Sequence, residues 1–188
     1  MPRIHTVTPE SLARARRRVV AELVRHGFWD AELAGVPVEL TWLGSAYGWQ
    51  WYGSTGEIRI PRISIARLQD RWNASPYVPL ADVLRHEYAH ALADTHRGLF
   101  RSRRFTFAYG APHDGEDEGT YDPRLFVSEW AATNAAEDYA ETFATFLRHD
   151  GRLPARLDTP AIREKWRFVR DLGRRVRRGW RTWRARSA

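Results

Sequence analysis

The sequence His-Glu-Tyr-Ala-His at residues 86–90 lies inside a segment, residues 79–94, that has good helix formers and no internal Gly or Pro. Residues four apart stand on the same face of a helix, so His86 and His90 can bind one tetrahedral metal ion. Glu87, adjacent to the first histidine, can then reach a water molecule at the metal. The pattern predicts a hydrolytic metal site with Glu87 as general base.

A simpler interpretation makes His86 and His90 ordinary helix residues and lets Glu87 form surface ion pairs. We favour the metal site, because two histidines at this spacing with a glutamate after the first are uncommon in a helix that binds no metal.

Composition limits the class of protein. The chain has 188 residues, of which 43% are hydrophobic, and this suits one compact domain with its own core. There is no cysteine, so a bound metal must use imidazole and carboxylate ligands. No run of apolar residues is long enough for a transmembrane helix, and the N-terminus lacks a signal-peptide core. We therefore expect a soluble, cytoplasmic protein.

Other elements are expected on both sides of the motif. Residues 9–26 have the apolar spacing of an amphipathic helix. Short β-branched and aromatic runs within residues 36–65, separated by glycines, predict a small antiparallel sheet. Residues 98–123, rich in Gly and acidic residues, are expected to be a long exposed loop, and residues 135–149 a second helix. A basic helix with aromatic residues is expected at 159–186.

The net positive charge of the chain is concentrated near its C-terminal end. Residues 163–186 contain eleven Lys or Arg and two acidic residues, a local balance of +9 within a total of +7. We therefore separate a domain at residues 1–158 from a basic amphipathic helix at 159–188 packed on it. Its arginines could contact nucleic acid or an anionic surface, with its tryptophans inserting or stacking. Alternatively, the tryptophans dock onto the domain and the arginines stay solvated. The tryptophans are Trp166, Trp180 and Trp183.

Three residues compete as third metal ligand, and the first is His96. The spacing from His86 to His96 is that of the metzincin pattern, but Ala93 stands where that pattern has its turn glycine. Metzincins also need a methionine turn beneath the metal, and the sole methionine is Met1. The second candidate is Asp122, in a Gly-Thr-Tyr-Asp stretch that resembles the start of the aspzincin motif. The rest of that motif is missing, and Asp122 could be a turn residue.

The third candidate is Glu137, within Asn-Ala-Ala-Glu-Asp-Tyr-Ala-Glu-Thr-Phe at residues 134–143. This segment resembles the second metal helix of gluzincins, notably the anthrax lethal factor catalytic domain and related bacterial zinc metallopeptidases. In those relatives a Glu-x-x-Ala-Glu-x-Phe pattern supplies the zinc-binding glutamate, which matches Glu137. Alternatively, Asn134 and Glu137 have the spacing of a capping box, in which the glutamate only satisfies backbone donors.

The resemblance covers residues 79–147 and implies a fold as well as a site. It implies an α+β, zincin-like fold with a small, mostly antiparallel sheet packed beside the HExxH helix, and with a second, glutamate-bearing helix. It also implies that Glu141 hydrogen-bonds a ligand imidazole and fixes its tautomer. In the alternative, Glu141 is a solvated helix charge.

Trp130 stands where such relatives have a tyrosine that can stabilise the oxyanion, seven residues before Glu137. Indole can donate a hydrogen bond but cannot act as an acid near neutral pH. Trp130 is therefore a candidate oxyanion or substrate contact, with Tyr121 as a substitute. Alternatively, Trp130 packs in the core.

These observations support two functional hypotheses. In the first, the protein is a zinc metallopeptidase that cleaves a peptide or protein substrate, with Zn²⁺ on His86, His90 and Glu137. In the second, it binds nucleic acid or an anionic surface and its zinc site is structural or inactive. We favour the first because structural zinc sites usually have four protein ligands and no need of a base such as Glu87.

Overall fold

The computed structural model describes residues 6–42, 48–52, 55–62, 80–115 and 119–179, and these form an α+β fold. The elements are α1 (Pro9–His26), α2 (Ala31–Ala34), β1 (Val38–Thr41), β2 (Gly48–Tyr52), β3 (Thr55–Pro61), α4 (Leu80–Thr95), α5 (Arg97–Phe100), α6 (Arg103–Tyr109), η1 (Trp130–Ala132), α7 (Ala135–Arg148), η2 (Ala155–Leu157) and α8 (Pro160–Arg177).

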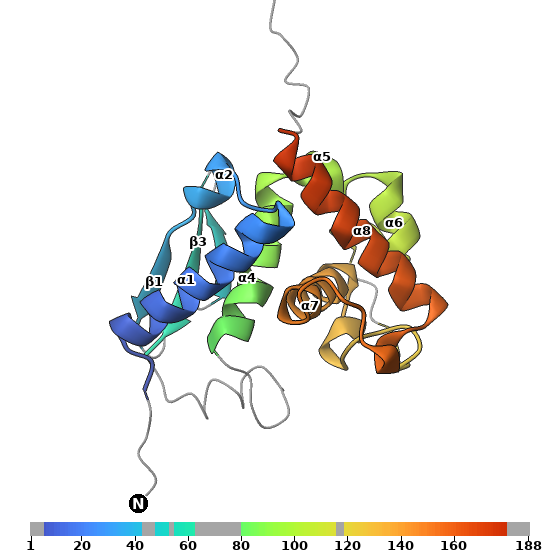
Figure 1. Ribbon diagram of the computed structural model, residues 1–188, viewed down its shortest axis with the longest axis horizontal. Helices are drawn as coiled ribbons and strands as arrows, with labels where there is room; N and C mark the ends of the chain where they lie inside the picture. The colour runs from blue at the N-terminus through green and yellow to red at the C-terminus, as the bar shows by residue number, and fades with distance from the viewer. Residues whose placement is uncertain (1–5, 43–47, 53–54, 63–79, 116–118, 180–188) are drawn as a thin grey trace, which may run out of the picture.

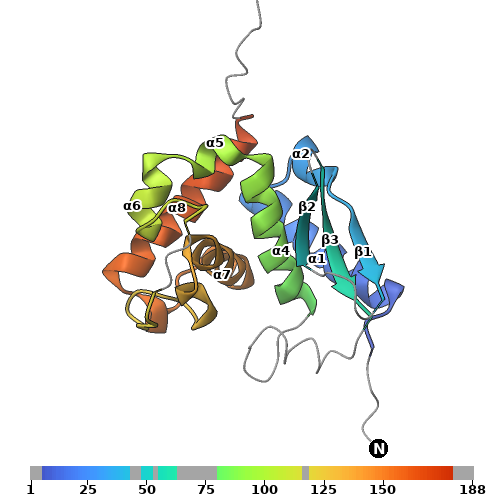
Figure 2. The same ribbon diagram turned by 180° about the vertical axis from the view of Figure 1, so that it is seen from behind.

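Helix α4 runs through the middle of the molecule. The sheet and α1 lie on one side of it, and α7, α6 and α8 lie on the other (Figures 1 and 2). Thirteen of its sixteen residues are buried, polar ones included. The sequence predicted a helix with one apolar side, but neighbours on both sides leave α4 no solvated face. Its polar side chains must therefore find partners inside the protein.

The sheet is mixed, which corrects the prediction of a mostly antiparallel one. The strand order is β1-β3-β2, with β2 antiparallel and β1 parallel to β3. Strand β3 carries Ile58 and Ile60, both fully buried, so the central position of the sheet suits it. Strand β3 therefore lies between the other two strands and pairs with both of them. Its pairing with β1 is the parallel one. Periodicity predicts that strands exist, but the order of pairing depends on which strand has most to bury.

The prediction of a long exposed loop at residues 98–123 is wrong for its first half. Helices α5 and α6 lie there, and Gly110 at φ +80° caps α6 instead of marking a loop. Phe100 and Phe105 are almost fully buried and pack against Tyr139 of α7. Aromatic packing on α7 outweighs the local turn signals of this segment.

Helix α8 packs on the rest of the fold through its apolar face. Ile162, Trp166 and Val169 belong to the same buried core as α4 and α7, and the Trp166 indole donates a hydrogen bond to the Gly151 carbonyl at 3.0 Å. The helix ends at Arg177. The predictions for Trp180 and Trp183 lie outside the described residues. Within the described part of the chain, no helix has both the length and the apolar character needed to cross a membrane.

Gly173 allows the close approach of α8 to the end of α1. A Cβ atom there would lie 2.3 Å from the carbonyl oxygen of His26, a backbone atom that cannot rotate away. Alanine usually stabilises a helix interior relative to glycine, so the two effects oppose each other. We predict that the clash dominates and that Gly173→Ala lowers the free energy of unfolding by roughly 1–3 kcal/mol.

Urea denaturation checks this prediction. Gly35→Ala is the control, because a Cβ there meets no atom closer than 3.5 Å. Equal stability of the Gly173→Ala variant and the wild type would contradict the close packing of α8 on α1.

Candidate metal centre

Helix α4 presents two of its residues to different neighbours. His86 and Glu87 are 5% and 4% exposed. Successive residues of a helix point about 100° apart, so a residue that faces α7 is followed by one that faces elsewhere. His86 contacts α7, and Glu87 contacts the backbone of β2. The proposed ligand and the proposed base thus lie on adjacent faces of one buried helix.

Helix α7 supplies the carboxylates. Asn134 begins the helix, and its side-chain oxygen accepts a hydrogen bond from the Glu137 backbone N–H at 2.9 Å. This is one half of the predicted capping box, in which the glutamate side chain would also bond the backbone N–H of Asn134. The Glu137 carboxylate, however, points at the two histidines of α4. Glu141 follows one turn later on the same face.

Three side chains converge closely enough to hold a metal ion. The Nε2 atoms of His86 and His90 lie 3.0 Å apart, and Glu137 oxygens lie 3.1 Å from the first and 3.5 Å from the second. Tetrahedral ligands about 2.05 Å from zinc would be about 3.3 Å from one another. Among the described residues, His86, His90 and Glu137 form the group that could bind a metal, and their donor atoms fit one ion.

The charges of the carboxylates govern the protonation of His86. Burial by itself would lower its pKa, but hydrogen bonds to Glu137 and Glu141 and the charge of Glu87 outweigh burial and raise the pKa from 6.5 to about 10. Burial would raise the pKa of Glu137, but its hydrogen bonds to His86 and His90 hold that pKa well below 4.5. Without a metal, a proton on His86 therefore balances the buried carboxylates.

Glu141 holds the far side of the His86 ring. Its Oε1 lies 2.8 Å from His86 Nδ1, and its Oε2 accepts a hydrogen bond from the Ser128 hydroxyl at 2.8 Å. Glu141 is thus not a solvated charge, and its partner is His86. A carboxylate at Nδ1 leaves Nε2 free to bind a metal. Nothing in the sequence pointed to Ser128.

Trp130 contacts Glu137, the proposed carboxylate ligand. Its indole N–H donates a hydrogen bond to Glu137 Oε2 at 2.6 Å. The side chain is partly exposed, so it is not a core residue. Its role as an oxyanion or substrate contact stays a prediction, while its hydrogen bond to Glu137 is a role that the sequence did not indicate.

The edge strand β2 fixes Glu87, the proposed base. Glu87 Oε2 accepts a hydrogen bond from the Trp49 backbone N–H at 2.5 Å, and the Trp49 indole donates to Asp94 on the same helix at 2.6 Å. Gly48, at φ +87°, brings the backbone to the carboxylate: a Cβ there would lie 3.1 Å from Glu87 Oε2. No sequence signal identified this contact, because its donor is a backbone group.

The two rival ligands have other partners. His96 Nε2 lies 2.8 Å from Asp30 Oδ2, and its Nδ1 lies 2.9 Å from the Thr95 hydroxyl. Asp122 is bound by Arg124 at 2.7 Å. Neither belongs to the convergent group. Tyr121, which the sequence offered as a substitute for Trp130, is 40% exposed, and its role as an oxyanion contact stays a prediction.

Comparisons with known proteins add no identification. No protein-family model matches the chain, and neither curated proteins nor solved structures gave a match. The gluzincin resemblance therefore stays a prediction, and the interpretation of this centre rests on its own geometry.

The charge balance of the centre predicts a pH dependence in metal-free protein. The folded pKa of His86 is about 10, above the value of about 6.5 expected in the unfolded chain. Protonated His86 therefore contributes stability that is fully present below about pH 6.5 and is lost as the pH rises through about 10. NMR titration of the His86 ring should show a proton retained well above neutral pH, and Glu141→Gln should lower that pKa. Titration of wild-type His86 near pH 6.5 would contradict the geometry.

Proposed function

We propose that this protein is a zinc-dependent metallopeptidase. The observation that carries the proposal is the convergence of His86, His90 and Glu137 within the separations expected of zinc ligands, with Glu87 fixed on the adjacent face of α4. Two imidazoles and one carboxylate with a fourth position for water are the ligand set of catalytic zinc sites. The absence of cysteine is consistent with this donor set.

The residues have separate roles in peptide-bond hydrolysis. His86, His90 and Glu137 would hold the zinc, which would supply a Lewis acid for the scissile carbonyl and lower the pKa of the attacking water. Glu87 accepts a proton from that water at its carboxylate and delivers the proton to the leaving amine. The Trp49 backbone N–H holds one oxygen of Glu87 in place. Glu141 and Trp130 keep the ligands His86 and Glu137 oriented.

Zinc content and hydrolysis test the proposal together. Wild type should bind zinc and cleave members of a quenched-fluorescent peptide library. Glu137→Ala should lose zinc because a ligand is gone, whereas His96→Ala should keep it, since His96 is bound to Asp30. Glu87→Gln should keep zinc but lose about 10²–10⁴-fold in hydrolysis, the range for removal of a general base.

Elemental analysis and the peptide assay give the readouts. Wild type without zinc would refute the metal centre, and Glu87→Gln cleaving at the wild-type rate would refute the role of the base.

The Trp130 hydrogen bond predicts a weaker effect on the metal. Trp130→Phe removes the donor to Glu137 while keeping an aromatic ring, and we expect zinc affinity to fall about 10–100-fold, as for other groups that support metal ligands. Competition with a chelator measures this affinity. Trp51→Phe is the control, because Trp51 stacks with Arg97 instead of contacting a ligand. Equal affinities in the two variants would mean that Trp130 does not support the site.

A further inference from the structure

A groove lies between α6 and α8, separate from the candidate metal centre. It has a volume of about 470 Å³, and none of the residues that line it belongs to the metal centre. Leu99, Phe168 and Leu172 form an apolar lining, of which Leu99 and Leu172 are almost fully buried. A groove of this volume is large enough for one or two bulky side chains of a ligand.

Phe107 marks the edge of the groove. It lines the groove from α6, and 77% of it is exposed, the highest value among the exposed large hydrophobic residues of the described chain. The neighbouring aromatic residues of the same helix, Phe105 and Tyr109, are buried against α7 and α8. The core therefore does not use Phe107. An exposed aromatic residue beside an apolar groove is typical of an interaction site.

The rim of the groove is basic. Four arginines line it against two acidic residues, and the arginines are Arg103, Arg104, Arg167 and Arg175. The acidic residues are partly neutralised by neighbours on α8, since Glu164 pairs with Arg167 at 2.5 Å and Asp171 pairs with Arg174 at 3.2 Å. Arg103 and Arg104 are exposed and form no ion pair with the described residues. The rim thus has positive charge available for an external anion.

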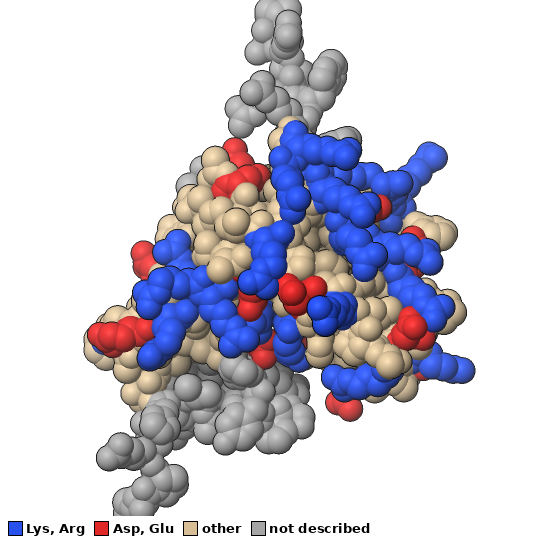
Figure 3. All heavy atoms as spheres, viewed as in Figure 1, with Lys and Arg blue, Asp and Glu red and all other residues tan. Residues whose placement is uncertain are grey.

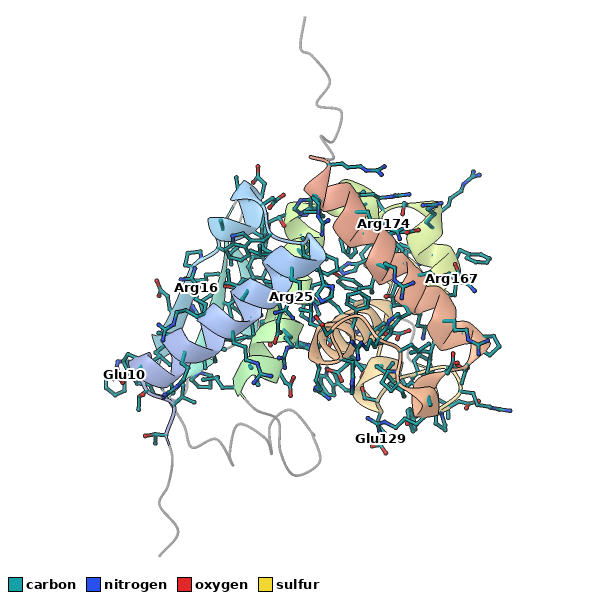
Figure 4. The ribbon with its side chains drawn as sticks, in the orientation of Figure 1. Glu10, Arg16, Arg25, Glu129, Arg167 and Arg174 are labelled. Carbon is teal, nitrogen blue, oxygen red and sulfur yellow. The ribbon has the colours of Figure 1, made fainter. Side chains whose placement is uncertain are left out.

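The same charge continues over the outer surface of α8. Basic side chains gather over this helix on the face shown in Figure 3. Arg167 and Arg174, labelled on α8 in Figure 4, have side chains that are 65% exposed. An acidic partner would therefore meet favourable potential before it reaches the groove.

We propose that the groove between α6 and α8 binds an acidic segment of a partner protein, which inserts a bulky apolar side chain between the rim arginines. The apolar lining takes the side chain, and carboxylates on either side of it pair with Arg103 and Arg104. A duplex nucleic acid would use the arginines but gain nothing from the apolar lining. A bilayer surface is too flat to fill a concave groove. The acidic amphipathic segment is the ligand that uses the concavity, the lining and the charge together.

Binding of defined peptides tests this proposal. The probe is a short fluorescein-labelled peptide of glutamate and aspartate around a phenylalanine–leucine pair, and its counterpart has serine at those two positions. Wild type should bind the probe more tightly than the counterpart. Two variants should each weaken binding about thirtyfold or more, the scale of an interface hot spot. The first is Arg103→Glu combined with Arg104→Glu, and the second is Phe107→Ser. Fluorescence anisotropy gives the affinities.

Matched variants separate the groove from general charge. Arg14→Glu combined with Arg17→Glu makes the same change of charge at exposed positions of α1, and Val24→Ser replaces an exposed apolar residue there. None of these residues lines the groove, so binding should be unchanged. All of these positions are exposed, so circular dichroism should show folded protein in each case. No preference for the probe over its serine counterpart, or equal losses in the α1 variants, would overturn the proposal. Tighter binding of oligothymidine or of phosphatidylglycerol vesicles, unaffected by Phe107→Ser, would also overturn it.

Discussion

The contact between α4 and α7 is the constraint on which the rest of the centre depends. It buries His86 against Glu137 and Glu141, and buried ionisable groups are costly unless they are paired. The pairing is strong enough to raise the pKa of His86 to about 10 in spite of burial. A metal ion would replace the proton as the balancing positive charge, so the same packing that needs a cation also arranges the ligands for one.

The residues that surround the ligands come from segments far apart in the sequence, and each fixes one group. Ser128 and Trp130, just before α7, donate to Glu141 and Glu137. Trp49 of β2 donates from its backbone to Glu87 on the adjacent face of α4. The donors thus hold the three carboxylates, and Glu137 and Glu141 in turn hold the imidazoles. The proposed catalytic site would require this kind of preorganisation.

The sequence predicted the parts of this centre that are local. Two histidines and a glutamate within one turn of α4, and two glutamates one turn apart on α7, are visible as spacing. The strand pairing order and helices α5 and α6 were missed because they depend on which residues find partners in the fold: Ile58 and Ile60 in the sheet, Phe105 against α7. The hydrogen bond from Trp130 and the backbone contact of Glu87 were missed because neither has a sequence pattern.

Helix α7 shows how the centre also depends on elements that carry none of its ligands. Glu137 and Glu141 face α4, whereas Asp138, one position further round the helix, forms a buried ion pair with Lys165 of α8 at 2.5 Å. A rotation of α7 about its axis would break contacts on both sides, leaving buried charges unpaired. Lys165 also donates to the Leu125 carbonyl at 2.5 Å, which ties the segment leading to Ser128 and Trp130 to the same helix. The orientation of the Glu137 and Glu141 carboxylates is therefore set partly by α8. This helix packs its apolar face in the core and keeps its arginines at the surface.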